Sequence, residues 1–148
     1  MPPPNPYEKL RNNALTAGVE GALMDLAYPN GSATLVAMAD GTVSMYVSSG
    51  GGFLGMGGRP AVRAAAQAFL SAAKRCAAGF SEATSSPLPN PGQVRFFVIA
   101  RNSVRASEAI DERAIQAAAH ALSPLYAAAQ AVVTQIRLVS VADSRARP

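Results

Sequence analysis

The sequence has few of the residues from which catalytic and structural sites are built. Its 148 residues contain a single cysteine, Cys76, a single histidine, His120, and no tryptophan. One cysteine excludes an intramolecular disulfide and any metal site that needs two cysteines, and it fits a reducing compartment. No Gly-x-Ser-x-Gly motif surrounds Ser48 or Ser49, and the acidic residues do not cluster as metal ligands. We therefore expect no catalytic residue, no metal site and no cofactor.

Charge is also sparse. Charged residues make up 15% of the chain, the net charge is +4, and the basic residues are scattered rather than gathered in a run. This distribution gives no specific signal for nucleic-acid binding. The longest uncharged stretches contain Gly, Pro, Ser or Asn, so no membrane span is expected. The N-terminus has no basic segment followed by an apolar one, as a secretory signal would, and we expect a cytoplasmic protein.

Small apolar residues are abundant. Hydrophobic residues account for 49% of the chain, and 31 of the 148 residues are alanine. This length and composition are typical of one folded domain rather than a disordered chain. We expect an extended lead-in at residues 1–6, a single α+β domain at residues 7–141, and a loose tail at residues 142–148.

In the first half of the chain, apolar spacing of three and four residues predicts a helix over residues 7–28. Two β-prone runs, 33–38 and 43–47, flank Asp40-Gly41, a dipeptide typical of a tight hairpin turn. Pro60 is suited to the first turn of a second helix, predicted over residues 59–80. Cys76 lies on the apolar side of that helix, so we expect its thiol to be buried.

In the second half, the proline-rich residues 81–92 predict a loop, followed by a central strand at 94–100 and a returning strand at 104–110. Residues 111–122 predict a short helix, and Ser123-Pro124 marks the start of a final one. Residues 136–141 fit either a helix or a fifth strand. The predicted class is α+β, an antiparallel sheet of four or five strands with helices packed on it, in the order α-β-β-α-β-β-α.

A glycine-rich loop is the most unusual feature of the sequence. Six of the nine residues from 50 to 58 are glycine, and a helix is predicted to follow. Backbone amides ahead of a helix can bind an anion, and nearby arginines would strengthen such a site. This interpretation gives a ligand site made of five residues: Gly55, Gly57, Gly58, Arg59 and Arg63.

Two other interpretations of the loop stay open. The lysine and serine or threonine of a phosphate-binding loop are absent after Gly57, which weakens the anion interpretation. The loop carries Phe53, Leu54 and Met56 among its glycines, and these side chains would form a surface for a protein partner. The loop can also be purely structural.

The element order resembles that of the small roadblock and profilin-like α+β domains, at the level of topology. The resemblance rests on the Asp40-Gly41 hairpin, the helix at 59–80, the strand at 94–100 and the closing helix. It implies a non-catalytic module that dimerises and regulates a small GTPase or scaffolds a complex. We expect a homodimeric interaction module. The alternative is a small-ligand or anion-binding protein, or an enzyme, that uses the glycine-rich loop.

Overall fold

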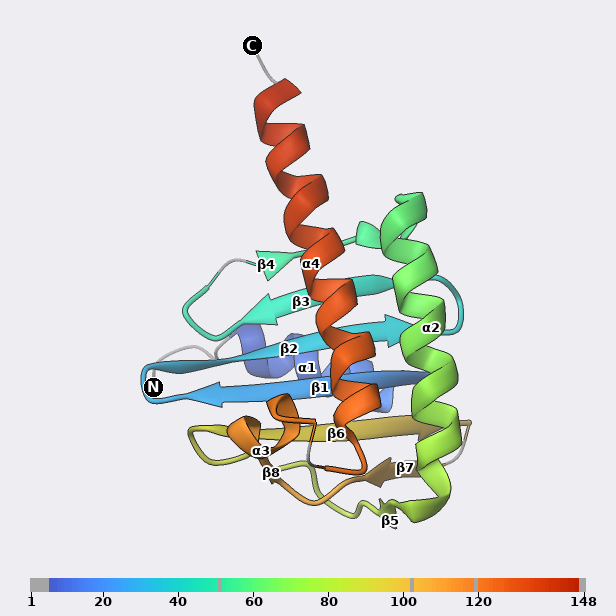
Figure 1. Ribbon diagram of the computed structural model, residues 1–148. Helices are drawn as coiled ribbons and strands as arrows, with labels where there is room; N and C mark the ends of the chain where they lie inside the picture. Colours follow the sequence, from blue (N-terminus) through green and yellow to red (C-terminus); the bar gives the residue numbers. More distant parts are fainter. Residues whose placement is uncertain (1–5, 51, 102, 119, 147–148) are drawn as a thin grey trace, which may run out of the picture.

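The computed structural model describes residues 6–50, 52–101, 103–118 and 120–146. It contains an open antiparallel sheet with helices on both faces, which confirms the expected α+β class (Figure 1). Of the expected lead-in, residues 1–5 lie outside the described part, and Pro6 begins the first helix.

The sheet has eight strands in the described part, in the order β4-β3-β2-β1-β6-β7-β5, with β8 paired to β6. Five of them have four or more residues: β1 (Gly21–Tyr28), β2 (Gly31–Met38), β3 (Val43–Val47), β6 (Gln93–Ala100) and β7 (Ser103–Ala106). The others have two residues each: β4 (Gly52–Phe53), β5 (Ser81–Glu82) and β8 (Ile110–Asp111). The expected count of four or five and the expected order α-β-β-α-β-β-α were wrong, because β1 was predicted as part of a helix and because a two-residue strand has no periodicity to detect.

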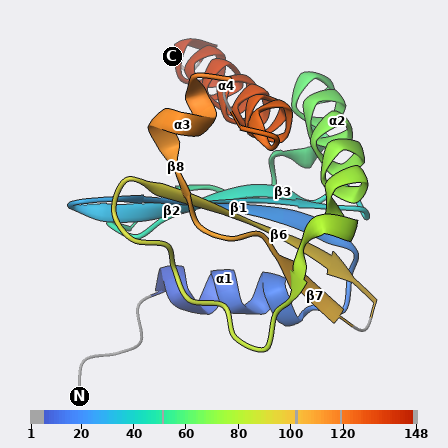
Figure 2. The ribbon, with the colours of Figure 1, turned by 60° about the horizontal axis from the view of Figure 1, so that its bottom comes forward.

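The helices form a layer on each face of the sheet. α1 (Pro6–Thr16) lies on one face, and α2 (Pro60–Cys76) and α4 (Ser123–Ala146) lie side by side on the other (Figure 2). The larger core lies between the sheet and α2 and α4, and includes Phe69, Phe96 and Ile136. The smaller core, which includes Leu23 and Phe97, lies under α1.

The predicted helix over residues 7–28 was wrong in its second half. α1 ends at Thr16, Gly18 follows with a φ of 73°, and residues 21–28 form β1. β1 lies between β2 and β6, and side chains on both of its faces are buried. A strand buried on both faces shows no alternation of apolar and polar residues, so its pattern is easily mistaken for a helical one. The first sheet segment is therefore a three-stranded meander, β1-β2-β3.

The Asp40-Gly41 hairpin was predicted correctly and joins β2 to β3. Gly41 has a φ of 98°, a conformation that glycine adopts without strain. The backbone N–H of Thr42 donates to Asp40 Oδ1 at 2.9 Å, and this hydrogen bond lowers the pKa of the Asp40 carboxyl. Local turn chemistry thus fixed this part of the fold.

The helix predicted over residues 59–80 corresponds to α2, with Pro60 in its first turn, and to the 3-10 turn η2 (Ala77–Gly79) that follows. Cys76 is half-buried rather than fully buried. It is the last residue of α2, and its side chain packs against the larger core.

α4 settles the ambiguous segment 136–141, which is helical rather than a fifth strand. The helix continues to Ala146, through part of the segment expected to be a loose tail, because neither glycine nor proline interrupts residues 125–146. In the described part, α4 is also the one helix long and apolar enough to cross a membrane, over Ser123–Ser144, with a mean hydropathy of 1.3 in its most apolar 18-residue stretch. Core helices meet the same criterion, and 33% of its most apolar stretch is buried in the domain.

The proline-rich residues between β5 and β6 cross the α1 side of the sheet (Figure 2). Arg95 on β6 holds this crossover, because its Nη1 donates to the carbonyl of Pro87 at 2.9 Å. β6 is a central strand as expected. The returning strand predicted over residues 104–110 is shorter than expected: β7 ends at Ala106, and Ile110 belongs to the separate strand β8. The helix predicted over 111–122 is only α3 (Glu112–Gln116), which Asp111 caps by accepting a hydrogen bond from the Arg113 N–H at 2.9 Å.

A buried polar network fastens α1 to the sheet. Arg11 on α1 forms an ion pair with Asp25 on β1, with Nη2 and Oδ2 2.6 Å apart, and both side chains are buried. Thr34 on β2 donates its hydroxyl proton to Asp25 Oδ1 at 2.6 Å. The Tyr7 hydroxyl lies 2.6 Å from Thr34 Oγ1, and the Arg11 guanidinium lies 5.5 Å from the centre of the Phe97 ring. The two buried charges thus neutralise each other, and further contacts within the protein offset their loss of water.

This network predicts the effect of removing the Asp25 carboxylate. Asp25→Ala leaves the Arg11 charge buried without its partner, and should lower the free energy of unfolding by about 3–5 kcal/mol. Urea denaturation monitored by circular dichroism measures the change.

Glu20→Ala is the matched control, because Glu20 pairs with Lys74 at 3.9 Å with both side chains largely exposed. Exposed pairs contribute little, so this variant should change stability by less than about 1 kcal/mol. Equal stability of the two variants would contradict the role assigned to the network.

Candidate functional site

The glycine-rich loop folds as an edge strand followed by a helical turn. Residues 52–53 form β4 against Met45 and Tyr46 of β3, and η1 (Met56–Gly58) leads into α2. Gly50, Gly52 and Gly55 have φ values of 93°, 140° and 65°. Gly51 lies outside the described residues. The described part of the loop therefore packs against the edge of the sheet. Three of its glycines have positive φ values, a conformation that residues with a side chain rarely adopt.

Three of the groups expected to bind an anion, the Gly55 N–H and the side chains of Arg59 and Arg63, have partners within the protein. The Gly55 N–H donates to Ser44 Oγ at 3.3 Å, and Arg63 Nε donates to the carbonyl of Gly57 at 3.0 Å. The Arg59 guanidinium forms an ion pair with Asp143 on α4. Gly58 lies in the same turn, η1. The structure brings the five residues together around one turn, but it directs both arginines at protein acceptors.

The three apolar side chains of the loop differ in exposure. Phe53 and Met56 are partly buried and pack against the larger core. Leu54 is 62% exposed. Of the surface expected for a protein partner, Leu54 is therefore the residue best placed to contact one.

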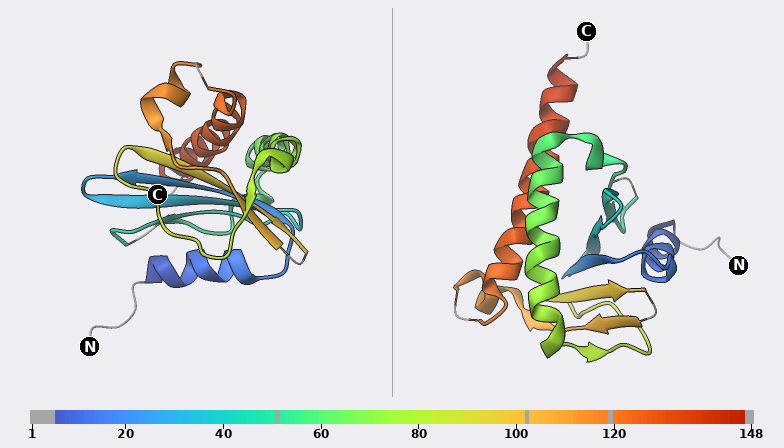
Figure 3. Two further views of the ribbon diagram at one scale, coloured as in Figure 1. Left: turned by 90° about the horizontal axis from the view of Figure 1, so that it is seen from below. Right: turned by 90° about the vertical axis from the view of Figure 1, so that its right-hand side faces the viewer.

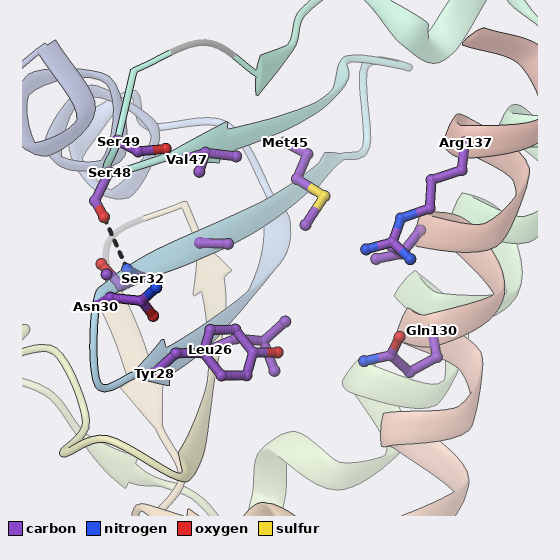
Figure 4. A pocket seen from close by; sticks show the side chains of 13 residues that line it. Leu26, Tyr28, Asn30, Ser32, Met45, Val47, Ser48, Ser49, Gln130 and Arg137 are labelled. Atoms are coloured by element: carbon purple, nitrogen blue, oxygen red, sulfur yellow. Dashed lines mark hydrogen bonds between the residues drawn. The ribbon is translucent and has the colours of Figure 1, made fainter. Parts of the chain in front are cut away.

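A separate pocket lies between α4 and the β1, β2 and β3 strands, with a volume of about 360 Å³. Figure 4 shows Gln130 and Arg137 reaching from α4 toward the strands, which carry Leu26, Tyr28 and Met45. The remaining lining residues are Asn30, Gly31, Ser32, Ala33, Val47, Ser48, Ser49 and Val133. The Ser32 N–H donates to Ser48 Oγ at 2.8 Å and so ties the two turns at the pocket rim.

The side chains that line the pocket include hydrogen-bond donors and one positive charge. Arg137 is the one charged residue among those that line it. Burial raises the pKa of the Tyr28 hydroxyl; the Glu112 charge adds to the rise and Arg137 opposes it. Tyr28 is therefore protonated at neutral pH and can donate a hydrogen bond.

Glu112, whose charge acts on Tyr28, has a hydrogen-bond partner of its own. Tyr126 donates its hydroxyl proton to Glu112 Oε2 at 2.7 Å and accepts a hydrogen bond from Gln116 Nε2 at 3.2 Å. Burial raises the pKa of Tyr126 to about 12, so this hydrogen bond persists over the whole neutral range.

Sequence reasoning missed Tyr28, Gln130 and Arg137. Gln130 and Arg137 are seven residues apart and so share a helix face, which is a visible signal. Nothing in the sequence indicates that this face lies over the β1-β2 turn, because that contact depends on the tertiary packing of α4.

The single histidine and the single cysteine of the chain lie away from the pocket under α4 and are not among its lining residues. The Leu122 N–H donates to His120 Nδ1 at 3.0 Å, in the turn before α4. Cys76 borders a separate cavity of about 520 Å³ with Phe80 and Leu122. Within the described residues, no three His, Cys, Asp or Glu side chains gather where they could hold a metal ion.

Comparisons with protein-family models, with curated proteins and with solved structures find no match for this chain. The function is therefore inferred from the geometry of the molecule itself.

The packing of the loop predicts different responses at two adjacent glycines. A Cβ on Gly57 would lie 1.7 Å from the Gly41 carbonyl oxygen, whereas a Cβ on Gly58 would meet nothing within 4 Å. Gly57→Ala should therefore lower stability by about 1–3 kcal/mol through overpacking. Gly58→Ala, the control, should leave the midpoint of urea unfolding nearly unchanged. Equal midpoints for both variants would show that the turn does not pack as described.

Proposed function

We propose that this protein is a non-catalytic interaction module that forms a homodimer through the free end of α4. The proposal keeps the function class expected from the roadblock-like resemblance, in which such a dimer binds a further protein, for example a small GTPase. It moves the contact surface from the glycine-rich loop alone to the helix beside that loop.

The observation that carries the proposal is the exposed apolar end of α4. Figure 1 and the right-hand view of Figure 3 show the helix continuing past the edge of the sheet. On this stretch, Leu138 is 58% exposed and Val141 is 50% exposed. Large apolar side chains on a projecting helix are typical of a surface that is covered in an assembly.

Leu54 belongs to the same end of the molecule. The ion pair between Arg59 and Asp143 connects the start of α2 to the projecting part of α4, and Leu54 lies five residues before Arg59. Leu138 and Val141 precede Asp143 by five and two residues, so they lie on the side of α4 that faces away from this ion pair and from Leu54. We call Leu138 and Val141 the α4-end surface.

The sheet edges favour helix contact over strand pairing between copies. β4 and β5, the two outermost strands, have only two residues each. Very short edge strands offer little backbone for a second sheet to extend. The small exposed residues Ala127 and Ala131 on α4 also permit another helix to approach closely.

The proposal predicts a dimer that the α4-end surface holds together. Light scattering coupled to size exclusion should return twice the 15.2 kDa chain mass at tens of micromolar protein, about the concentration at which a weak dimer forms. Leu138→Ser with Val141→Ser should shift the mass to that of the monomer and leave the circular dichroism spectrum unchanged, because both side chains are exposed.

Leu88→Ser is the matched control, because Leu88 is also exposed but lies in the crossover before β6. It should leave the dimer intact. A monomeric wild-type protein would overturn the proposal. Binding of the monomer to lipid vesicles that depends on Leu138 and Val141 would show instead that the α4-end surface meets a membrane.

A further inference from the structure

The pocket under α4 has the size and composition of a small-molecule site. Its volume of about 360 Å³ lies within the range of roughly 300–1,000 Å³ that is usual for ligand pockets. Such pockets combine an apolar lining with a few polar groups that fix the orientation of the ligand. The pocket is distinct from the α4-end surface, because no residue of that surface lines it.

The apolar part of the lining lies mainly on the sheet. Leu26, Ala33 and Met45 come from neighbouring strands and are themselves buried, so they form a preformed floor. Val133 contributes from α4. A floor made of side chains already fixed in the core needs little reorganisation when a ligand covers it.

The polar part includes Gln130 and Arg137 on α4, Tyr28 at the end of β1, and uncharged residues of the turns that follow β1 and β3. Gln130 and Arg137 point from the helix toward the strands, and Tyr28 lies at the end of the β1 strand (Figure 4). Among the described residues Arg137 forms no ion pair, in contrast to Arg11 and Arg59. The lining contains no Asp or Glu, so the pocket presents one positive charge with nothing in it to neutralise that charge.

We propose that this pocket binds a small organic monoanion with an apolar body. Its carboxylate pairs with the Arg137 guanidinium, the Gln130 amide and the Tyr28 hydroxyl donate further hydrogen bonds, and the apolar body covers Leu26 and Met45. An arginine fork matches a carboxylate in geometry and charge. A phosphate monoester would bring a second negative charge that no other cation of the lining compensates.

Octanoate is the probe for the test, with octan-1-ol as its neutral counterpart and inorganic phosphate as an anion without an apolar body. In ¹H–¹⁵N spectra of the wild-type protein, octanoate below its micelle-forming concentration should shift the amides of Ser32, Ser48 and Gln130 saturably. Octan-1-ol should bind at least about tenfold more weakly, which corresponds to the loss of roughly one charge-assisted hydrogen bond. Inorganic phosphate should leave the chemical shifts of these amides unchanged.

Arg137→Gln should reduce the octanoate affinity by at least about tenfold and leave the affinity for octan-1-ol unchanged, because only the charge pair is lost. Arg75→Gln is the matched control, since Arg75 is an exposed arginine on α2 outside the pocket. Three results would each overturn the proposal: equal affinities for octanoate and octan-1-ol, an unchanged octanoate affinity in Arg137→Gln, or no shift at the pocket amides at millimolar octanoate.

The same titration on the Leu138→Ser, Val141→Ser variant separates this inference from the proposed function. Neither residue lines the pocket, so octanoate should bind the variant as it binds the wild-type protein. Failure of the dimer proposal would thus leave the pocket result intact, and failure of octanoate binding would leave the assembly result intact.

Discussion

The carboxylate of Asp25 is the constraint around which one face of this protein is built. It lies in the middle of β1, a central strand, and is shielded from water. A buried carboxylate is stable only with a charge partner and hydrogen bonds. Arg11 and Thr34 supply them, so α1 must lie across β1, and β2 must pair in the register that sets Thr34 opposite Asp25. The position of the eleven-residue helix α1 on the sheet is therefore set by the ion pair between Arg11 and this carboxylate.

The parts of the fold that sequence reasoning predicted are those with local signals. Asp40-Gly41 requires a tight turn, and Pro60 marks the start of α2, so both were placed correctly. β1 was not, because burial on both faces removes the alternation that identifies a strand. Residues 136–141 stayed open between helix and strand for the opposite reason: their apolar and polar residues alternate in part as they do in a strand, although they belong to α4. Whether such a run is helix or strand depends on neighbours distant in the sequence.

The candidate sites show the same division. The glycine-rich loop was visible from composition. The need for glycine at position 57 comes from the close approach of η1 to Gly41 in the β2-β3 turn, and no spacing rule predicts this contact. The pocket under α4 joins Tyr28 to Arg137, and the buried ion pair joins Arg11 to Asp25. In the sequence, the one sign of this buried ion pair was a lone aspartate in the apolar run of residues 21–28. α4 changes role along its length, from core element to pocket wall to projecting surface.

The strand order also determines how the chain reaches this structure. The meander β1-β2-β3 is local, but the other edge of β1 is closed only by β6, through pairs such as Leu26 with Val94. During synthesis β1 therefore emerges from the ribosome long before β6, its second neighbour. The edge of β1 that pairs with β6 stays unpaired while the residues of α2 are synthesised. Non-local closure of this kind slows folding. A nascent chain of this protein passes through a stage in which β1, a strand buried on both faces in the folded protein, has one unpaired edge, and that stage is where misassembly between chains would begin.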